Sequence, residues 1–328
     1  MKAKISYTAR YLPERVLTNF DLEKMVDTTD EWIRSRTGIE KRHLVGEGEA
    51  TSDMCTMIAK QLLEKSGKAA EEIDLILIAT STPDYMVVST AALVQDKIGA
   101  INAWGYDIVA ACTGFVYAME TGSKLVESGQ YKNAMVIGAD TMSSIIDYTD
   151  RNTCVIFGDG GGGVLLEPSK DETGILDSIL HVDGSGSKYL TVPAGGSLHP
   201  ASKDTVDKKM HYVYQDGKTV FKFAVKNMAD VSKRILDRNQ LTGDDIKLFI
   251  PHQANQRIID AAAKRCGLAD EKVFININRY GNTTAGTIPI ALDEAVESKR
   301  LKKDDILLLA AFGGGFTWGS MLIQWSNK

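Results

Sequence analysis

Two long segments of the chain repeat one order of features, and this repetition constrains the fold more than any other property of the sequence. In the first, residues 107–115 lead into an amphipathic helical pattern, and the apolar run 134–140 follows. In the second, residues 273–286 lead into another helical pattern, and the apolar run 305–311 follows. A duplicated unit of this kind is expected to place Cys112 and Asn282 at corresponding strand-to-helix corners.

Short apolar runs alternate with helical patterns in both halves of the chain. The runs are β-branched or rich in leucine, as in strands buried on both faces: residues 73–79, 134–139, 246–250 and 306–311. This alternation predicts an α/β fold with parallel strands. We expect an N-terminal half of residues 1–170 and a C-terminal half of residues 171–328, with capping loops within residues 183–217.

Composition excludes several classes of protein. The chain has 328 residues, of which 44% are hydrophobic and 25% charged, as in an ordinary globular protein, and its formal net charge of −5 disfavours nucleic-acid partners. No apolar run approaches the roughly 18 residues of a membrane helix, and the N-terminus lacks a signal-peptide core. We therefore expect a cytoplasmic protein with no membrane or nucleic-acid partner.

The four cysteines show no CxxC spacing, so neither a disulfide framework nor a metal site is expected. Cys55, Cys154 and Cys266 fit small core positions. Cys112 falls at the first turn of a predicted helix, where unpaired backbone N–H groups and the helix dipole favour a thiolate. It is the best nucleophile in the chain, although its local sequence equally fits one more buried thiol.

Two polar residues could complement this cysteine. His252 follows a predicted buried strand, at the kind of strand end where α/β folds place functional side chains. Asn282 lies in a glycine-containing turn, where its amide has hydrogen bonds to donate. Each alone is more often structural, and it is their joint placement with Cys112 that indicates a site.

Two glycine-rich stretches need separate interpretations. Residues 157–163 lack the Lys-Ser/Thr of a phosphate loop and are predicted to form a turn between strands where backbones crowd. Residues 312–316 follow the final strand of the second half, where their backbone N–H groups are placed to bind an oxyanion.

Six motifs together resemble the β-ketoacyl-acyl-carrier-protein synthase III family, the condensing enzymes that start bacterial fatty-acid synthesis. They are residues 30–39 (DEWIRSRTGI), 110–112 (AAC), 150–151 (DR), 251–255 (PHQAN), 281–283 (GNT) and 311–319 (AFGGGFTWG). The resemblance covers essentially the whole chain. It implies a thiolase-like fold, with two pseudo-duplicated α/β halves packed in a five-layer αβαβα arrangement, and a homodimer.

The resemblance also implies a chemistry. Cys112 takes an acyl group from an acyl-coenzyme A primer, and malonyl-acyl carrier protein then loses carbon dioxide and attacks the acyl-cysteine. His252 and Asn282 stabilise the enolate, and the backbone N–H groups of Cys112 and Gly314 form the oxyanion hole. The product is 3-oxoacyl-acyl carrier protein, and no metal or redox cofactor is required.

Binding residues carry over from the family by position. Coenzyme and pantetheine contacts are expected at Trp32, Arg36, Arg151, Gly217, Phe221, Ala254 and Asn255. The dock for the acidic acyl carrier protein is expected at Lys222, Arg257, Lys264 and Arg265, although these also fit an ordinary solvated face.

Two positions depart from the family. Val87 matches the end of the acyl pocket, where members that prefer acetyl commonly have phenylalanine, so tolerance of longer or branched primers is expected. Gln215 stands where the family often has an apolar residue at the tunnel mouth.

Three alternatives remain open at this stage. The nearest is a specialised thiolase-superfamily acyltransferase or ketosynthase of secondary metabolism. A catalytically silent acyl-carrier-binding protein would keep the fold without the reaction. A cysteine hydrolase would use Asn282 to orient His252.

Overall fold

Two β-sheets form the framework of the protein in the computed structural model, which describes residues 1–327. Lys328, the last residue of the expected C-terminal half, lies outside the described part of the chain. The five-stranded sheet has the order β1 (Ala3–Tyr11), β7 (Gly160–Pro168), β6 (Ala134–Asp140), β4 (Leu75–Ala79), β5 (Trp104–Ile108). The four-stranded sheet has the order β11 (Leu248–Pro251), β12 (Ile306–Gly313), β13 (Thr317–Gln324), β8 (Gly174–Val182).

The remaining elements surround these sheets. Two short ribbons pair β2 (Arg15–Thr18) with β3 (Lys41–Leu44) and β9 (Leu190–Thr191) with β10 (Tyr214–Gln215). The helices are α1 (Asn19–Leu22), α2 (Asp30–Thr37), α3 (Thr51–Ser66), α4 (Thr90–Ile98), α5 (Gly114–Glu127), α6 (Arg151–Cys154), α7 (Lys203–Asp207), α8 (Gly217–Arg238), α9 (Gln256–Arg265), α10 (Ile277–Tyr280) and α11 (Thr287–Glu297). Two 3₁₀ turns matter for the site: η2 (Ala111–Thr113) and η6 (Thr284–Gly286).

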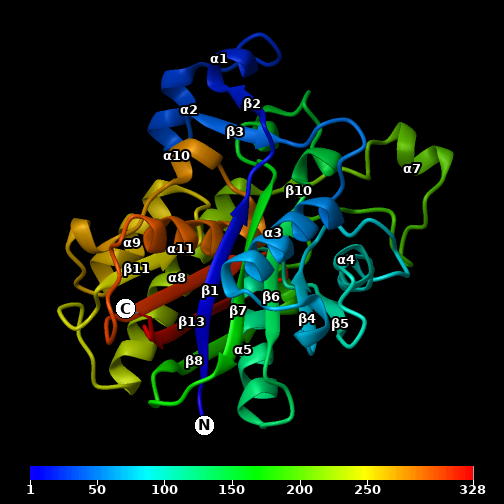
Figure 1. Cartoon of the computed structure of the whole chain (residues 1–328). Helices are drawn as coiled ribbons and strands as arrows, with labels where there is room; N and C mark the ends of the chain where they lie inside the picture. Colours follow the sequence, from blue (N-terminus) through cyan, green and yellow to red (C-terminus); the bar gives the residue numbers. More distant parts are fainter. Residues whose placement is uncertain (328) are drawn as a thin grey trace.

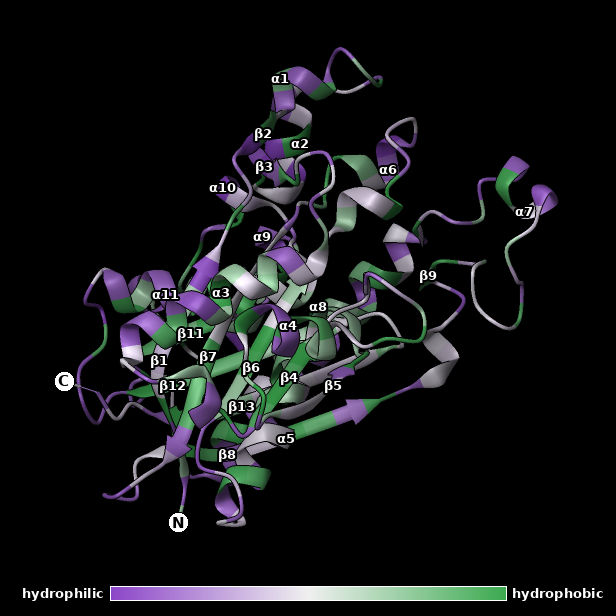
Figure 2. Cartoon of the chain, turned by 45° about the vertical axis from the view of Figure 1, so that its right-hand side comes forward, coloured by the Kyte–Doolittle hydropathy of each residue, from purple (hydrophilic) through white to green (hydrophobic). Residues whose placement is uncertain are grey.

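The sheets and helices stack in five layers, as expected. The central helices α5 and α11 lie between the sheets, because Phe115 and Leu292 share one core with Leu77 of the first sheet and Leu309 of the second. Helices α3 and α4 cover the outer face of the five-stranded sheet, and α8 and α9 cover that of the four-stranded sheet (Figure 1). Figure 2 shows β4 and β6 largely in the hydrophobic colour, as strands buried on both faces should be.

The strand directions differ in part from the prediction. β4 runs parallel to β5 and β6, and β11 runs parallel to β12, but β1, β7, β8 and β13 pair antiparallel to their neighbours. Residues 314–316 join β12 to β13, and so short a connection permits only a hairpin. The sheets are therefore mixed, with parallel strands confined to the parts that carry the corners.

The segment near residue 273, which takes the place of β5 in the second half, forms only a single bridge, between Phe249 and Val273. The buried side chain of Gln253 makes hydrogen bonds to this segment that a neighbouring strand would otherwise make. Its Nε2 donates to the carbonyl of Phe274 at 3.0 Å, and its Oε1 accepts from the N–H groups of Asn276 and Ile277 at 3.1 and 3.2 Å. A side-chain amide thus replaces a neighbouring strand.

The prediction of a turn for the glycine-rich residues 157–163 is partly wrong. Residues 160–163 belong to β7, paired to β1 on one side and β6 on the other, and only residues 157–159 lie between elements. The expected crowding of backbones is present, because a Cβ on Gly162 would lie 2.7 Å from the backbone of Pro289. Glycine therefore lets α11 approach the sheet closely.

The two strand-to-helix corners correspond, as expected. Each has a 3₁₀ turn opening a central helix, and each turn begins with a non-glycine residue at positive φ: Ala111 at 47° and Thr284 at 48°. This superposes Cys112 on Ala285 and leaves Asn282 before the turn. The prediction that Cys112 and Asn282 lie at corresponding corners is therefore confirmed, while the register of the two turns follows from the left-handed residues, which spacing between motifs does not reveal.

The predicted capping segment, residues 183–217, contains only short elements: β9, α7, β10 and a 3₁₀ turn. Both views show the part around α7 extending away from the body of the protein (Figures 1 and 2). The two ends of the segment contact the core, since Leu190 and Gln215 line the cavity described next.

Candidate active site

Cys112, His252 and Asn282 come together at one cavity of about 260 Å³. Their side chains are almost fully buried, with residue exposures of 6%, 2% and 5% respectively. They come from three separate places: the η2 corner, the residue after β11, and the loop before η6. The fold therefore places a sulfur, an imidazole and an amide around one enclosed space.

The Cys112 thiol is less acidic than its place at the start of a helix suggests. Burial and, to a smaller extent, the charge of Asp140 raise the pKa of Cys112 to about 12. The backbone N–H of Cys112 and the side chain of Asn282 act in the opposite direction, but their effect is smaller. In the ligand-free protein the thiol form therefore predominates at neutral pH, which corrects the expectation of a resting thiolate.

Asn282 is fixed by both its backbone and its side chain. Its N–H donates to Ile156 at 3.0 Å, and its carbonyl accepts from Gly158 at 3.1 Å, so the first half of the chain positions it. Its Oδ1 accepts from the N–H of Thr284 at 2.8 Å. With Oδ1 committed to the backbone, the amide NH₂ faces the cysteine as a donor.

His252 is held one residue beyond β11, where its backbone N–H donates to the carbonyl of Ala310 at 2.8 Å. Its Nδ1 lies 2.7 Å from Oγ1 of Thr287. Its Nε2 is buried and has no partner among the described residues. Burial lowers the pKa of His252 to about 3, so the imidazole is neutral at physiological pH.

Asp140 is a site residue that sequence reasoning missed. This fully buried carboxylate at the end of β6 accepts from Thr80 Oγ1 at 3.0 Å and the Ser81 N–H at 2.6 Å, and across the molecule from the Thr284 hydroxyl and the Ala285 N–H. Burial raises its pKa, and these hydrogen bonds oppose the shift. The signal that could have identified it is an acidic residue at the end of an otherwise apolar run, residues 134–140.

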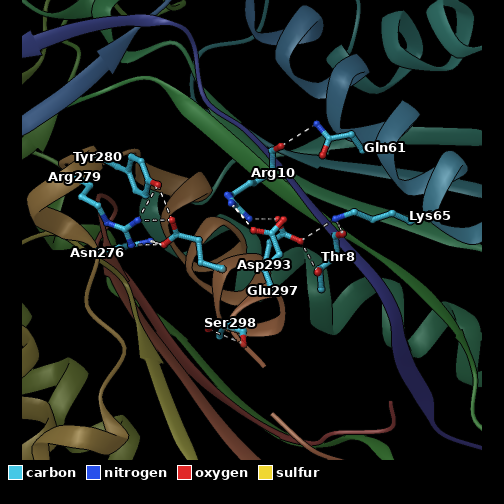
Figure 3. A network of polar contacts seen from close by, with 12 residues as sticks. Thr8, Arg10, Gln61, Lys65, Asn276, Arg279, Tyr280, Asp293, Glu297 and Ser298 are labelled. Atoms are coloured by element: carbon cyan, nitrogen blue, oxygen red, sulfur yellow. Dashed lines mark hydrogen bonds and ion pairs between the residues drawn. The ribbon is translucent and has the colours of Figure 1, made fainter. Parts of the chain in front are cut away.

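Helix α11, which carries Thr287, is anchored by two consecutive buried carboxylates. Asp293 accepts from Thr8 at 2.6 Å and from Arg10 at 2.5 Å, with Lys65 at 3.3 Å (Figure 3). Glu294 binds the segment before Asn282 through Asn276, Arg279 and Tyr280 at 2.6–2.9 Å. The helix is thereby tied both to β1 and α3 and to α10.

The expected coenzyme residues gather at the mouth of the cavity. Trp32, Gly217, Phe221, Ala254 and Asn255 line it, as does Gln215. Arg36 and Arg151 place their guanidinium carbons 4.9 and 5.2 Å from the centre of the Trp32 ring.

Asn255 has a structural task besides lining the cavity. Its side chain caps α9 by accepting from the N–H of Arg257 at 3.0 Å, and it donates to the carbonyl of Arg36 at 2.8 Å. It therefore ties α9 to the end of α2 at the mouth of the cavity.

A second cavity of about 130 Å³ lies on the other side of Cys112. Gly314 lines it, and its apolar walls include Met142, Ile145, Phe157, Leu190, Val192 and Val213. Val87 is not among them: it lies in the loop before α4 with 96% of its surface exposed. The assignment of Val87 to the acyl pocket is therefore not supported within one chain, because this loop turns its side chain outward.

The residues expected to dock the carrier protein lie on the outer layer. Lys222 of α8 and Arg257, Lys264 and Arg265 of α9 are all exposed. The Arg257 guanidinium lies 5.0 Å from the centre of the Phe221 ring, so the basic surface reaches the mouth of the cavity. Arg265 is partly neutralised by Asp230 at 3.5 Å.

Among residues 1–327, no group of three or more His, Cys, Asp or Glu side chains is arranged to hold a metal ion. In the same part of the chain, no helix has the length and apolar character needed to cross a membrane.

The layered fold, with a cysteine at one central corner and two polar donors around it, defines a thiolase-like condensing enzyme. Comparison with known proteins gives the family. The family profile described as 3-oxoacyl-[acyl-carrier-protein] synthase III matches residues 106–184, and its C-terminal counterpart matches residues 236–325.

Relatives of full length agree with these matches. A β-ketoacyl-[acyl-carrier-protein] synthase III from Chlorobium luteolum is 57% identical over 99% of this chain and 100% of its own length. One from Koribacter versatilis is 55% identical over 99% of this chain and 98% of its own. The crystal structure of 3-oxoacyl-[acyl-carrier-protein] synthase III from Aquifex aeolicus is 43% identical, with a TM-score of 0.91 over 98% of this chain and 100% of that one. The chain belongs to the β-ketoacyl-acyl-carrier-protein synthase III family, and it is an acyltransferase of the condensing type.

The raised pKa of Cys112 makes a testable prediction about its reactivity. In the ligand-free protein, alkylation by iodoacetamide is expected to accelerate about tenfold per pH unit between about pH 7 and 9, because the thiolate fraction grows at that rate below the pKa. Mass spectrometry of the Cys112 peptide over time measures the rate. In denaturant the same cysteine is the control, and its rate should level off once the pH passes the free value of about 8.5. A plateau near neutral pH in the folded protein would contradict burial as the dominant effect.

Proposed function

We propose that this chain condenses an acyl-coenzyme A primer with malonyl-acyl carrier protein to give 3-oxoacyl-acyl carrier protein, coenzyme A and carbon dioxide, the step that starts fatty-acid synthesis. The observation that carries the proposal is the convergence of Cys112, His252 and Asn282 on one buried cavity. Family membership supports the same reaction over a role in secondary metabolism, since the curated relatives are named as synthases of this type.

In the first stage, the sulfur of Cys112 attacks the thioester carbon of the primer. The S–C bond to the cysteine forms, the C–S bond to the coenzyme breaks, and the thiol proton of Cys112 leaves with the coenzyme as its thiol. Asn282 and the backbone N–H of Cys112 lower the energy of the sulfur anion, which is the form that attacks. In this proposal, the N–H groups of Cys112 and Gly314, which line the same cavity, bind the oxygen anion that forms on the acyl carbon.

In the second stage, malonyl-acyl carrier protein loses carbon dioxide and leaves an enolate on its thioester. The enolate carbon attacks the acyl-cysteine, the C–S bond to Cys112 breaks, and the released thiolate takes a proton from solvent. His252 and Asn282 donate hydrogen bonds to the enolate oxygen. Removing one such donor typically costs about 3–4 kcal/mol of transition-state stabilisation. These steps require neither a metal nor a redox cofactor.

The coenzyme binds at the mouth of the larger cavity in this proposal. Trp32 offers a flat face for the adenine, and Arg36 and Arg151 stand beside it with charges suited to phosphates. The pantetheine arm then passes Gly217, Phe221, Ala254 and Asn255 to reach Cys112. The acyl group occupies the smaller, apolar cavity beyond the sulfur.

We also propose a cytoplasmic location. Cys55, Cys112, Cys154 and Cys266 are all free, and a reducing compartment keeps the nucleophile in the thiol form that the first stage needs.

A panel of primers tests reaction type and acyl-pocket size together. With malonyl-acyl carrier protein as extender, acetyl-, isobutyryl- and hexanoyl-coenzyme A are each expected to yield 3-oxoacyl product and carbon dioxide. The apolar walls of the smaller cavity should favour added methylenes by about 0.8 kcal/mol each when buried. Initial rates of carbon dioxide release measure this, and the Cys112→Ala variant should release no coenzyme.

Each alternative gives a different result in this panel. Strict acetyl preference would defeat the expected pocket size, and transfer without carbon dioxide would indicate a plain acyltransferase. Thioester hydrolysis faster than condensation would indicate a hydrolase. Failure of Cys112 to gain the mass of an acyl group from acyl-coenzyme A would indicate a silent carrier-binding protein.

Charge reversal tests the proposed dock for the carrier protein. Lys264 is exposed on α9 and makes no ion pair within residues 1–327, so Lys264→Glu should raise KM for malonyl-acyl carrier protein several-fold, and more at low salt. Acylation of Cys112 by acyl-coenzyme A should not change. Lys60→Glu on α3, in the opposite outer layer, is the matched control. Equal effects of both substitutions on KM would contradict the dock.

We propose a homodimer that forms around the exposed edge of the five-stranded sheet. β5 ends this sheet, and exposed apolar side chains surround it or lie in the loop before α4: Ile101, Trp104, Val109, Tyr85, Met86, Val87 and Val88. Sedimentation equilibrium should give twice the chain mass of 35.8 kDa, and Val109→Glu should shift the protein toward the monomer. A monomeric wild-type protein would refute the proposal.

A further inference from the structure

The hydrogen-bonding role of His252 depends on which ring nitrogen carries its single proton. A neutral imidazole has one N–H donor and one acceptor nitrogen, and the partner of one nitrogen determines the state of the other. Only Nδ1 has a protein partner, the hydroxyl of Thr287 at 2.7 Å, while Nε2 is buried without one among the described residues. The Thr287 hydroxyl therefore decides what Nε2 presents to the cavity.

The proton of the Thr287 hydroxyl has two acceptors within reach. One is Nδ1 of His252 at 2.7 Å, and the other is the carbonyl oxygen of Thr284 at 3.2 Å. That carbonyl already accepts the backbone N–H of Thr287 at the end of η6, whereas Nδ1 has no other partner within residues 1–327. Both the shorter distance and the otherwise unsatisfied nitrogen favour donation from Thr287 to His252.

We propose that Thr287 is a positioning residue that holds His252 in the tautomer with the proton on Nε2, so that the imidazole is a preset hydrogen-bond donor and not a base. The inference rests on the proposed function and assigns one role to His252 within it. The amide of Asn282 is oriented in the same way, because Thr284 occupies its oxygen. One corner of the chain, residues 284–287, thus orients both donors, the Asn282 amide and the His252 imidazole.

This arrangement suits the second stage of the reaction. A buried Nε2–H without a protein acceptor is costly in the free enzyme and becomes satisfied when negative charge develops on the thioester oxygen, so its full benefit falls on the transition state. A base at Nε2 would instead present a lone pair to that oxygen and repel it. The neutral state of the ring agrees with a donor that neither gains nor loses its proton.

Nitrogen NMR of the ligand-free protein tests the tautomer directly. Two-bond proton–nitrogen correlations in ¹⁵N-histidine-labelled protein distinguish a protonated Nε2 from a protonated Nδ1, and the His252→Gln variant identifies the His252 signals among the five histidines. We expect Nε2 to carry the proton in the wild type and in Thr287→Ser, and a mixed or reversed tautomer in Thr287→Val. A wild-type ring protonated on Nδ1 overturns the proposal, whether or not Thr287→Val folds.

The separate half-reactions give the functional readout. Thr287→Val should slow decarboxylation of malonyl-acyl carrier protein by preacylated enzyme about tenfold or more, since it weakens one of two enolate donors, and Thr287→Ser should restore the rate. Acylation of Cys112 should change much less. Thr283→Val is the matched control, because it removes a neighbouring buried hydroxyl that has no partner among the described residues. Equal losses in both half-reactions, or in both Val variants, overturn the positioning role.

These measurements separate the inference from the function on which it rests. The tautomer is read in the absence of any substrate, so it stands or falls without condensation activity. If the wild-type protein shows the expected tautomer but releases no carbon dioxide, the proposed function fails and the assignment of the donor survives. If carbon dioxide is released by a protein with the opposite tautomer, the function survives and the role of Thr287 fails.

Discussion

The arrangement of the site depends on one buried carboxylate. Asp140 ends β6 and accepts hydrogen bonds from the residues after β4 on one side and from the η6 corner on the other. It thus joins the turn next to Asn282 to the sheet that carries Cys112. A charge in this position is costly to bury, and five donors from the protein offset that cost. Burial is the main cause of the raised pKa of Cys112, and the charge of Asp140 adds to it, so the contact that assembles the site also helps to keep its nucleophile protonated at rest.

The neutral states of the Cys112 thiol and the His252 imidazole in the ligand-free protein have a physical reason. A thiol and a neutral imidazole can be enclosed together at small electrostatic cost, whereas a thiolate and an imidazolium in the same cavity would each lose hydration. In the proposed reaction, negative charge develops on the reacting groups once a thioester is in place. The hydrogen-bond donors are already oriented for that charge. Thr284 orients the Asn282 amide, the backbone of His252 is held by Ala310, and its imidazole is held by Thr287.

Much of this organisation could be predicted from the sequence. Apolar runs mark the buried strands, and chemistry in α/β folds follows strand ends, so His252 could be selected before any coordinates. Cys112 could be selected because small residues and a helical pattern adjoin it. The motif resemblance then supplied the five-layer fold. These inferences succeed because they depend on periodicity and local spacing, which one chain records directly.

Other features depend on contacts that spacing does not record. The pairing of Cys112 with Ala285 follows from a left-handed residue in each turn, and Gln253 replaces a strand only because its amide meets a distant backbone. Val87 could be aligned with a family position, but the direction of its loop is a tertiary property. Thr287 reads as an ordinary threonine near a helix start until His252 is found beside it.

The two cavities meet at a shared wall of Cys112, Phe157 and Leu190. In the proposed reaction, an acyl group on the sulfur occupies the smaller cavity, and the departing coenzyme vacates the larger one. The malonyl thioester then uses that same larger cavity, so the two substrates are not resident together. The proposed reaction therefore implies strict alternation, and each turnover passes through a state in which the protein alone stores the starter group.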